Sequence, residues 1–83
     1  MVDWHKFDAA EYQLELNEEK LAAHGVDADE AVEVLWNGFE VRRNKASRDR
    51  YQIVGRTDAG RTLKLIVHDT GKKTLRIITG WPL

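Results

Sequence analysis

The chain contains no cysteine and a single proline, Pro82, among its 83 residues. Without cysteine it has no disulfide framework, no thiolate zinc site and no cysteine nucleophile. The three histidines, His5, His24 and His68, lack the close spacing of metal ligands, so we expect no metal site and no cofactor. Because no internal proline and no low-complexity segment divides the chain, one domain is predicted over residues 1–83.

Long hydrophobic runs are also missing. No apolar segment approaches the roughly 20 residues that a membrane-spanning helix needs, and the segment Met1 to Lys6 does not resemble a signal peptide. Hydrophobic residues make up 42% and charged residues 33% of the chain, which is an ordinary soluble composition. We therefore expect a cytoplasmic globular domain that does not contact a membrane.

The charges are divided between the two halves of the chain. Residues 1–40 contain 11 Asp and Glu but only 2 Lys and Arg, whereas residues 41–83 contain 3 Asp and Glu and 11 Lys and Arg. This division favours a basic half that meets an anion, while the acidic half is solvated or meets a cationic partner. The alternative is that the charges simply cover two solvated surfaces.

Hydrophobic periodicity predicts two helices and five strands. Helices at 18–24 and 28–37 are indicated by Asn17 as an N-cap, Gly25 as a stop, and Asp27 with Glu30 as a capping box. Period-two patterns predict strands at 11–16, 39–44, 50–57, 61–68 and 74–79. The remaining segment, residues 1–10, is either a short helix or an N-terminal arm.

Matching the apolar faces of the strands predicts their register. Three-residue loops at 58–60 and 70–72 would pair Ile53 with Leu65 and Val67 with Leu75. The resulting core face, covered by both helices, contains Tyr51, Ile53, Leu63, Leu65, Val67, Leu75 and Ile77. The predicted fold class is therefore α+β, with two short helices packed on an antiparallel sheet.

The opposite face of this sheet is predicted to be both basic and apolar. Its cationic side chains are Arg56, Lys64, His68 and Arg76, and its apolar ones are Val54, Ile66 and Ile78. Such a face suits a phosphate-bearing ligand, a protein partner, or both. Exposed apolar side chains mark interaction surfaces, so we expect a partner protein, a second copy in a homodimer, or residues 1–10 to cover Val54, Ile66 and Ile78.

Several segments together resemble the BrnT family. They include His24-Gly25-Val26 within 17–26, the following 27–35, and the segments 41–44, 51–61 and 75–79, so that the resemblance spans about residues 11–81. It implies a RelE-like fold and a ribonuclease toxin of a type II toxin–antitoxin pair, which cleaves RNA without a metal. The implied partner is a ribbon-helix-helix antitoxin. Trp81 stands where the family commonly has an arginine.

Candidate residues follow from the chemistry of metal-free RNA cleavage, in which a 2′-hydroxyl attacks the phosphodiester. His68 is the candidate general acid or base because histidine titrates near neutral pH, and the candidates for phosphate contact at the catalytic site are Arg56, Lys64 and Arg76. The candidates for wider RNA binding are Arg42, Arg43, Lys45, Arg48, Arg50 and Arg61. Two alternatives remain open: a non-catalytic module that binds an antitoxin or nucleic acid, and a small interaction domain unrelated to RNA.

Overall fold

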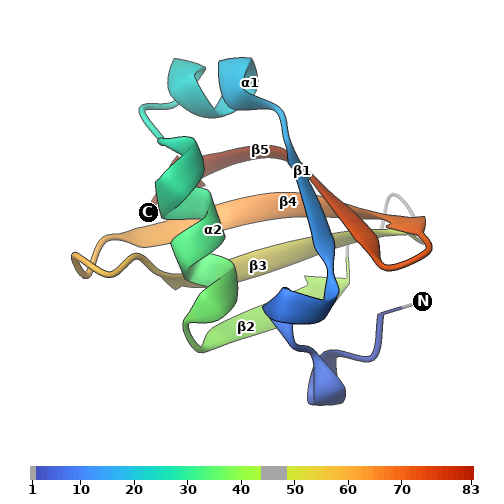
Figure 1. Cartoon of the computed structure of the whole chain (residues 1–83). Helices are drawn as coiled ribbons and strands as arrows, with labels where there is room; N and C mark the ends of the chain where they lie inside the picture. The colour runs from blue at the N-terminus through green and yellow to red at the C-terminus, as the bar shows by residue number, and fades with distance from the viewer. Residues whose placement is uncertain (1, 44–48) are drawn as a thin grey trace.

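The computed structural model describes residues 2–43 and 49–83, in which two helices pack on a five-stranded sheet (Figure 1). The N-terminal segment forms two 3₁₀ turns, Trp4–Lys6 and Ala9–Glu11. The α-helices are α1, Glu18–Ala23, and α2, Ala28–Trp36. The strands are β1, Gln13–Leu16; β2, Phe39–Arg43; β3, Arg50–Arg56; β4, Thr62–Gly71; and β5, Thr74–Pro82. The predicted helices are confirmed to within one residue at each end.

The sheet is mixed, which corrects the prediction of an antiparallel sheet. Its strand order is β1-β5-β4-β3-β2. Three neighbouring pairs are antiparallel, but β1 lies parallel to β5, with Leu14 beside Leu75 and Leu16 beside Ile77. The antiparallel partners are consecutive strands of the chain, whereas the β1–β5 pair brings together residues about 60 positions apart. The apolar alternation of β1 predicts a strand but does not identify the strand beside it.

Helix α1 begins and ends at the residues that the sequence predicts, and helix α2 begins there. The Asn17 side chain accepts a hydrogen bond from Lys20 N–H at 3.2 Å, and Gly25 ends α1 with a φ of 73°. Val26 N–H donates to Leu21 C=O while Gly25 N–H donates to Ala22 C=O, which is the Schellman pattern. Asp27 and Glu30 form the expected capping box of α2. No helix in the described part of the chain is long and apolar enough to cross a membrane.

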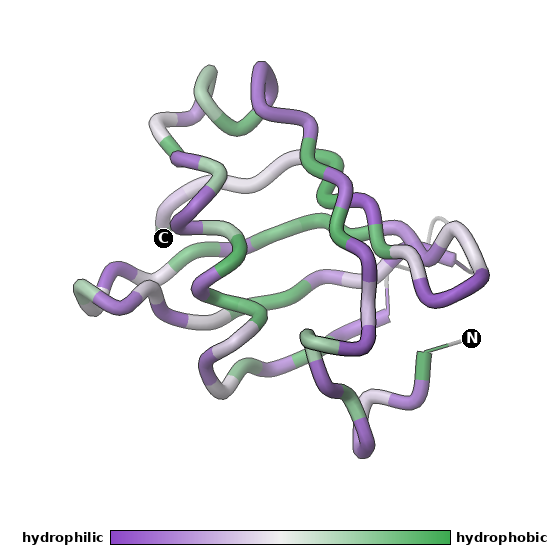
Figure 2. The backbone as a smooth tube through the Cα atoms, in the orientation of Figure 1, coloured by the Kyte–Doolittle hydropathy of each residue, from purple (hydrophilic) through white to green (hydrophobic). Residues whose placement is uncertain are grey.

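The core lies between the helices and one face of the sheet. Helix α1 packs on β5, and α2 packs on β3 and β4, so both helices cover the same face (Figure 1). Along the strands behind α2, hydrophobic stretches are interrupted by hydrophilic and neutral residues (Figure 2). All seven residues of the predicted core face are buried, and from the helices Leu21, Ala31, Val34 and Leu35 complete the core. At the end of α2, Trp36 lies outside the core, because 59% of it is exposed.

The register prediction is confirmed for β3 and β4 but wrong for β4 and β5. Ile53 pairs with Leu65, and Gly60 has a φ of 88° in the predicted three-residue loop. Between β4 and β5, however, Val67 pairs with Ile77, and the register shifts near Ile66 and again near Asp69. The hairpin closes on two residues, Lys72 and Lys73, both with positive φ, and not on the predicted loop 70–72. The extra residue of β4 between Asp69 and Gly71 offsets the change of loop, so Leu75 and Ile77 stay in the core.

The N-terminal segment packs on the helix-covered side of the sheet. The Trp4 ring lies 5.1 Å from Tyr51 and 5.9 Å from Phe39, measured between ring centroids. Tyr51 belongs to the core cluster, and Phe39 packs against it. Val2 and Ala9 are buried, so this segment extends the core. The expectation that residues 1–10 cover the opposite face is therefore wrong for the described residues 2–10.

Candidate nucleic-acid interface

The second face of the sheet carries no helix in the described part of the chain. Both helices and the aromatic residues of the N-terminal segment pack on the other face. On this second face, here called the open face, side chains alternate with the buried ones along each strand, and the strand pairing fixes which of them are neighbours. The predicted site residues that lie on the open face are Arg42, Arg50, Val54, Arg56, Lys64, Ile66, His68 and Arg76.

Four of the open-face residues form one row across four strands. Arg50 on β3 pairs with His68 on β4, and His68 pairs with Arg76 on β5. Arg76 in turn lies beside Glu15 on β1. Because neighbouring strands lie about 5 Å apart, His68 has a guanidinium-bearing residue on each side, and the backbones of Arg50 and Arg76 are about 10 Å apart. The row therefore combines two phosphate-binding groups with one imidazole and one carboxylate.

Two further rows fill the middle of the open face. Val54 pairs with Lys64, which pairs with Trp81, and Gln52 pairs with Ile66, which pairs with Thr79. Val54, Lys64, Ile66 and Trp81 are all half-buried. Ile78 is the extra residue at the register shift and has no partner on β4, so strand alternation does not assign it to this face. The middle of the face thus combines three apolar side chains with a lysine, a glutamine and a threonine, and arginines lie near its ends.

Glu15 lies in the row but is not among the site residues that the sequence predicts. Its carboxylate Oε1 lies 3.6 Å from the Arg76 guanidinium, and the two side chains are 44% and 54% exposed. The alternation of Leu14 and Leu16 with Glu15 indicates that Glu15 faces away from the core. No local signal shows that Arg76 is its neighbour, because that contact depends on the parallel pairing of β1 with β5.

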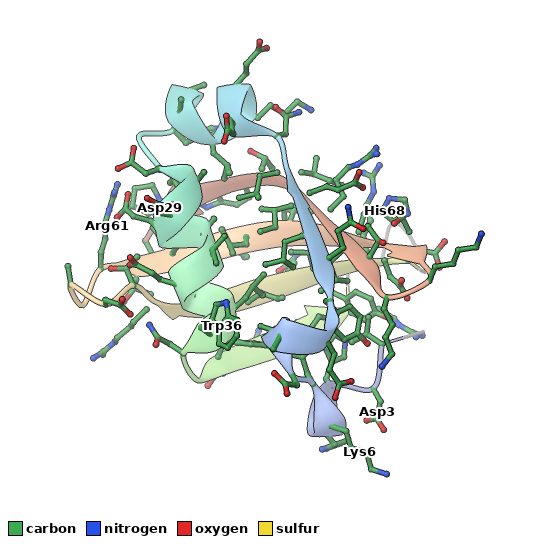
Figure 3. The ribbon with its side chains drawn as sticks, in the orientation of Figure 1. Asp3, Lys6, Asp29, Trp36, Arg61 and His68 are labelled. Carbon is green, nitrogen blue, oxygen red and sulfur yellow. The ribbon has the colours of Figure 1, made fainter. Side chains whose placement is uncertain are left out.

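Arg61 lies apart from this face. It sits beside α2, whereas His68 lies toward the opposite end of β4 (Figure 3). The Arg61 guanidinium donates to both carboxylate oxygens of Glu30, at 3.0 and 3.1 Å. The Asp27 N–H and, to a lesser degree, Arg61 hold the pKa of Glu30 below its ordinary value of 4.5, although partial burial opposes them. The arrangement gives Arg61 a structural partner on α2.

The other candidates for wider RNA binding, from Arg42 to Arg50, do not all lie on one face of the sheet. Arg42 and Arg50 lie on the open face, but Arg43 pairs with the buried Tyr51 and lies on the helix-covered side. Lys45 and Arg48 lie outside the described residues. The strands therefore bring Arg42, Arg50, Arg56, Lys64 and Arg76 to one surface.

No group of three or more His, Cys, Asp or Glu side chains in residues 2–43 and 49–83 is arranged to hold a metal ion. The open face offers hydrogen-bond donors of another kind, guanidinium and ammonium groups, which are suited to bind phosphate.

Comparison of the chain with protein-family models, with curated proteins and with solved structures finds no match. The resemblance to the BrnT family, drawn from the sequence segments, stays a prediction.

Proposed function

We propose that the protein is an endoribonuclease that cleaves RNA without a metal ion, as a RelE-like toxin of the BrnT type would. The observation that carries this proposal is the row of Arg50, His68 and Arg76 on a sheet face that no described helix covers. Guanidinium groups bind phosphate through paired hydrogen bonds, and the imidazole between them can transfer a proton near neutral pH. The ligand class is therefore the RNA backbone.

The proposed reaction is attack of a ribose 2′-hydroxyl on the adjacent phosphorus. The 2′-oxygen forms a bond to phosphorus and gives up its proton, while the bond from phosphorus to the 5′-oxygen breaks and that oxygen gains a proton. The products are a 2′,3′-cyclic phosphate and a 5′-hydroxyl. Two proton transfers and stabilisation of the charged phosphorane are needed.

The row supplies one group for each of these requirements. Arg76 lies between Glu15 and His68, so a phosphate held by its guanidinium lies between a carboxylate and an imidazole. In the proposal, the Glu15 carboxylate accepts the 2′ proton and the His68 imidazolium donates one to the 5′-oxygen. Arg50, on the far side of His68, binds the same phosphate or its neighbour.

The deciding experiment measures cleavage and binding separately, on an RNA oligonucleotide in EDTA. Glu15→Gln and His68→Ala are expected to lower the cleavage rate at least 100-fold, in keeping with the loss of a general acid or base. Glu15→Gln should at the same time bind RNA as tightly as the parent or more tightly, because it removes a negative charge from the face. Arg76→Ala should weaken both binding and cleavage.

Asp29→Asn is the matched control for Glu15→Gln. It makes the same change from carboxylate to amide on α2, where the Asp29 side chain is exposed and is not part of the row, so cleavage should stay within about twofold of the parent. RNA binding without cleavage in the parent chain would contradict the enzymatic proposal and favour the non-catalytic module. Absence of both would contradict the RNA proposal itself.

The apolar side chains in the middle of the open face support a second element of the proposal, a protein partner. Val54 and Ile66 lie among the basic residues and are only half-buried. An inhibitor that covered them would also cover the row of Arg50, His68 and Arg76. The resemblance implies a ribbon-helix-helix antitoxin in this role, and a co-expressed protein of that class should abolish RNA binding when it forms a complex with the chain.

A further inference from the structure

The β2 strand is an edge of the sheet with a groove along its helix-covered side. Strand order places β2 last, and in the described residues no backbone group from outside the sheet is hydrogen-bonded to it. Phe39, Val41 and Arg43, the residues of β2 that face this side, line a groove of about 970 Å³. The opposite wall of the groove comes from the N-terminal segment and the end of α2.

Trp4, one of the residues that line the groove, carries an unpaired hydrogen-bond donor. The indole Nε1 of Trp4 is buried and has no hydrogen-bond partner in the described part of the chain. The indole ring itself is held by edge contacts with Phe39 and Tyr51 and lies 5.1 Å from the Phe7 ring. Buried indole N–H groups usually find an acceptor. Because Nε1 is buried, a carbonyl or carboxylate oxygen of an occupant reaches it only if the indole ring turns toward the groove.

Two further side chains of the groove indicate which residue types the occupant has. Trp36, on the last turn of α2, lines the groove and is 59% exposed, although it is one of the largest apolar side chains of the molecule. Arg43, at the end of β2, lines the same groove and is exposed. The first favours apolar side chains in the occupant, and the second favours an acidic one at the end that lies beside Arg43.

We propose that an extended segment of another protein binds beside β2 as a sixth strand. An unpaired strand edge accepts such a segment through backbone hydrogen bonds, and alternate side chains of the segment then face the same side. In this complex, apolar residues at every second position enter the groove against Trp36 and Phe39. An acidic residue lies at Arg43, and an oxygen of the segment accepts the Trp4 indole proton.

This docking surface is independent of the proposed RNA-binding face. Arg43 and Arg42 are consecutive in β2, but Arg43 lines the groove whereas Arg42 lies on the open face. A partner bound in the groove therefore leaves Arg50, His68 and Arg76 uncovered. Failure of either proposal does not decide the other, because Arg42 tests the RNA-binding proposal and Arg43 tests the docking proposal.

The test begins with selection of a random peptide library displayed on phage against the full chain. We expect enriched sequences to alternate apolar and polar residues and to carry Asp or Glu at one end. The best sequence, synthesised as a free peptide, should change the backbone amide NMR signals of β2. N-methylation of alternate residues should abolish binding when it removes the N–H groups that face β2, and should be tolerated at the intervening residues.

Variants of the protein then test the two polar contacts. Arg43→Ala should weaken the peptide at least tenfold and Trp4→Phe, which keeps an aromatic ring, about fivefold, in line with a charged and a neutral hydrogen bond. Arg42→Ala is the matched control and should stay within about twofold. Circular dichroism checks that each variant is folded, and the N-methylated peptides need no protein variant.

Three results would overturn the proposal. The first is that no sequence is enriched. The second is that enriched peptides lack the alternation, or that their affinity depends neither on which residues are N-methylated nor on Arg43→Ala. The third is a dimer of the chain alone, seen by light scattering and broken by Arg43→Ala, which would make a second copy the occupant of the groove.

Discussion

Arg42 and Arg43 are neighbours in sequence, yet they lie on opposite faces of the sheet. Arg42 pairs with Gln52 on the open face, whereas Arg43 pairs with the buried Tyr51 beside the groove. The period-two geometry of β2 thus divides a pair of arginines that the sequence presents as one basic unit. One cation serves the surface proposed for RNA, and the other serves the surface proposed for a protein segment.

The first prediction uses this pair to locate the RNA-binding face. Arg42→Ala should weaken binding of an RNA oligonucleotide and reduce the dependence of log K on log salt by about one phosphate contact, or roughly 0.7 for single strands. Arg43→Ala should leave both the affinity and the salt slope nearly unchanged. Fluorescence anisotropy over a series of salt concentrations measures both quantities.

The two variants have the same net charge, so a general electrostatic effect would change both equally. Equal loss in Arg42→Ala and Arg43→Ala would mean that RNA does not distinguish the two faces. A larger loss in Arg43→Ala would move the RNA site to the groove.

The second prediction concerns the close approach of α1 to β4 and β5 at Gly80. A Cβ atom on Gly80 would lie 2.6 Å from Leu65 Cδ2 and 3.0 Å from the carbonyl oxygen of Lys64. The leucine methyl can shift, but the backbone oxygen is fixed by the sheet. Gly80→Ala should therefore lower the free energy of unfolding by about 2 kcal/mol, the usual cost of overpacking.

Gly38→Ala is the control for Gly80→Ala. A Cβ at Gly38 meets no atom within 4 Å, and its φ is not in the left-handed region. Alanine there should stabilise the protein by about 0.5 kcal/mol, because it restricts the unfolded chain. Urea unfolding of both variants measures the difference, and a Gly80→Ala variant as stable as Gly38→Ala would show that the sheet yields at this point.

Local sequence signals predicted the helices and most strands because each depends on residues close in the chain. Asn17, Gly25 and Glu30 define helix ends through contacts within four residues. The alternation in β3 and β4 fixed their register because the loop at Gly60 is regular. The β4–β5 register failed because the hairpin turns at Lys72 and Lys73 and β4 carries an extra residue between Asp69 and Gly71, which an apolar pattern alone does not reveal.

The candidate site was predictable to the same extent. Strand alternation put Arg56, Lys64, His68 and Arg76 on one face, and the structure agrees. The neighbour of Arg76, Glu15, depends on a parallel pairing between distant parts of the chain. The pairing of Arg61 with Glu30 depends on how α2 packs against the loop at Gly60. Neither contact has a signature in the local sequence.

The third prediction concerns the pH dependence of stability that Glu30 contributes. Its carboxylate accepts from Asp27 N–H at 3.2 Å and from the Arg61 guanidinium, which together lower the pKa of Glu30 in the folded state. A lowered folded pKa means that the contribution is complete above the ordinary value of 4.5 and is lost as the pH falls through the folded pKa.

Glu30→Gln keeps an acceptor for Asp27 N–H but removes the charge. Near neutral pH it should therefore lower the free energy of unfolding by only about 0.5 kcal/mol, because the ion pair with Arg61 is partly exposed. Glu30→Ala, which also removes the cap, should cost about 1 kcal/mol. The difference between the parent and Glu30→Gln, followed by urea unfolding from neutral pH to about pH 3, should disappear at the acidic end. A difference that stays constant over this range would show that the charge of Glu30 does not stabilise the fold and that the carboxylate acts only through its shape and its hydrogen bond to Asp27.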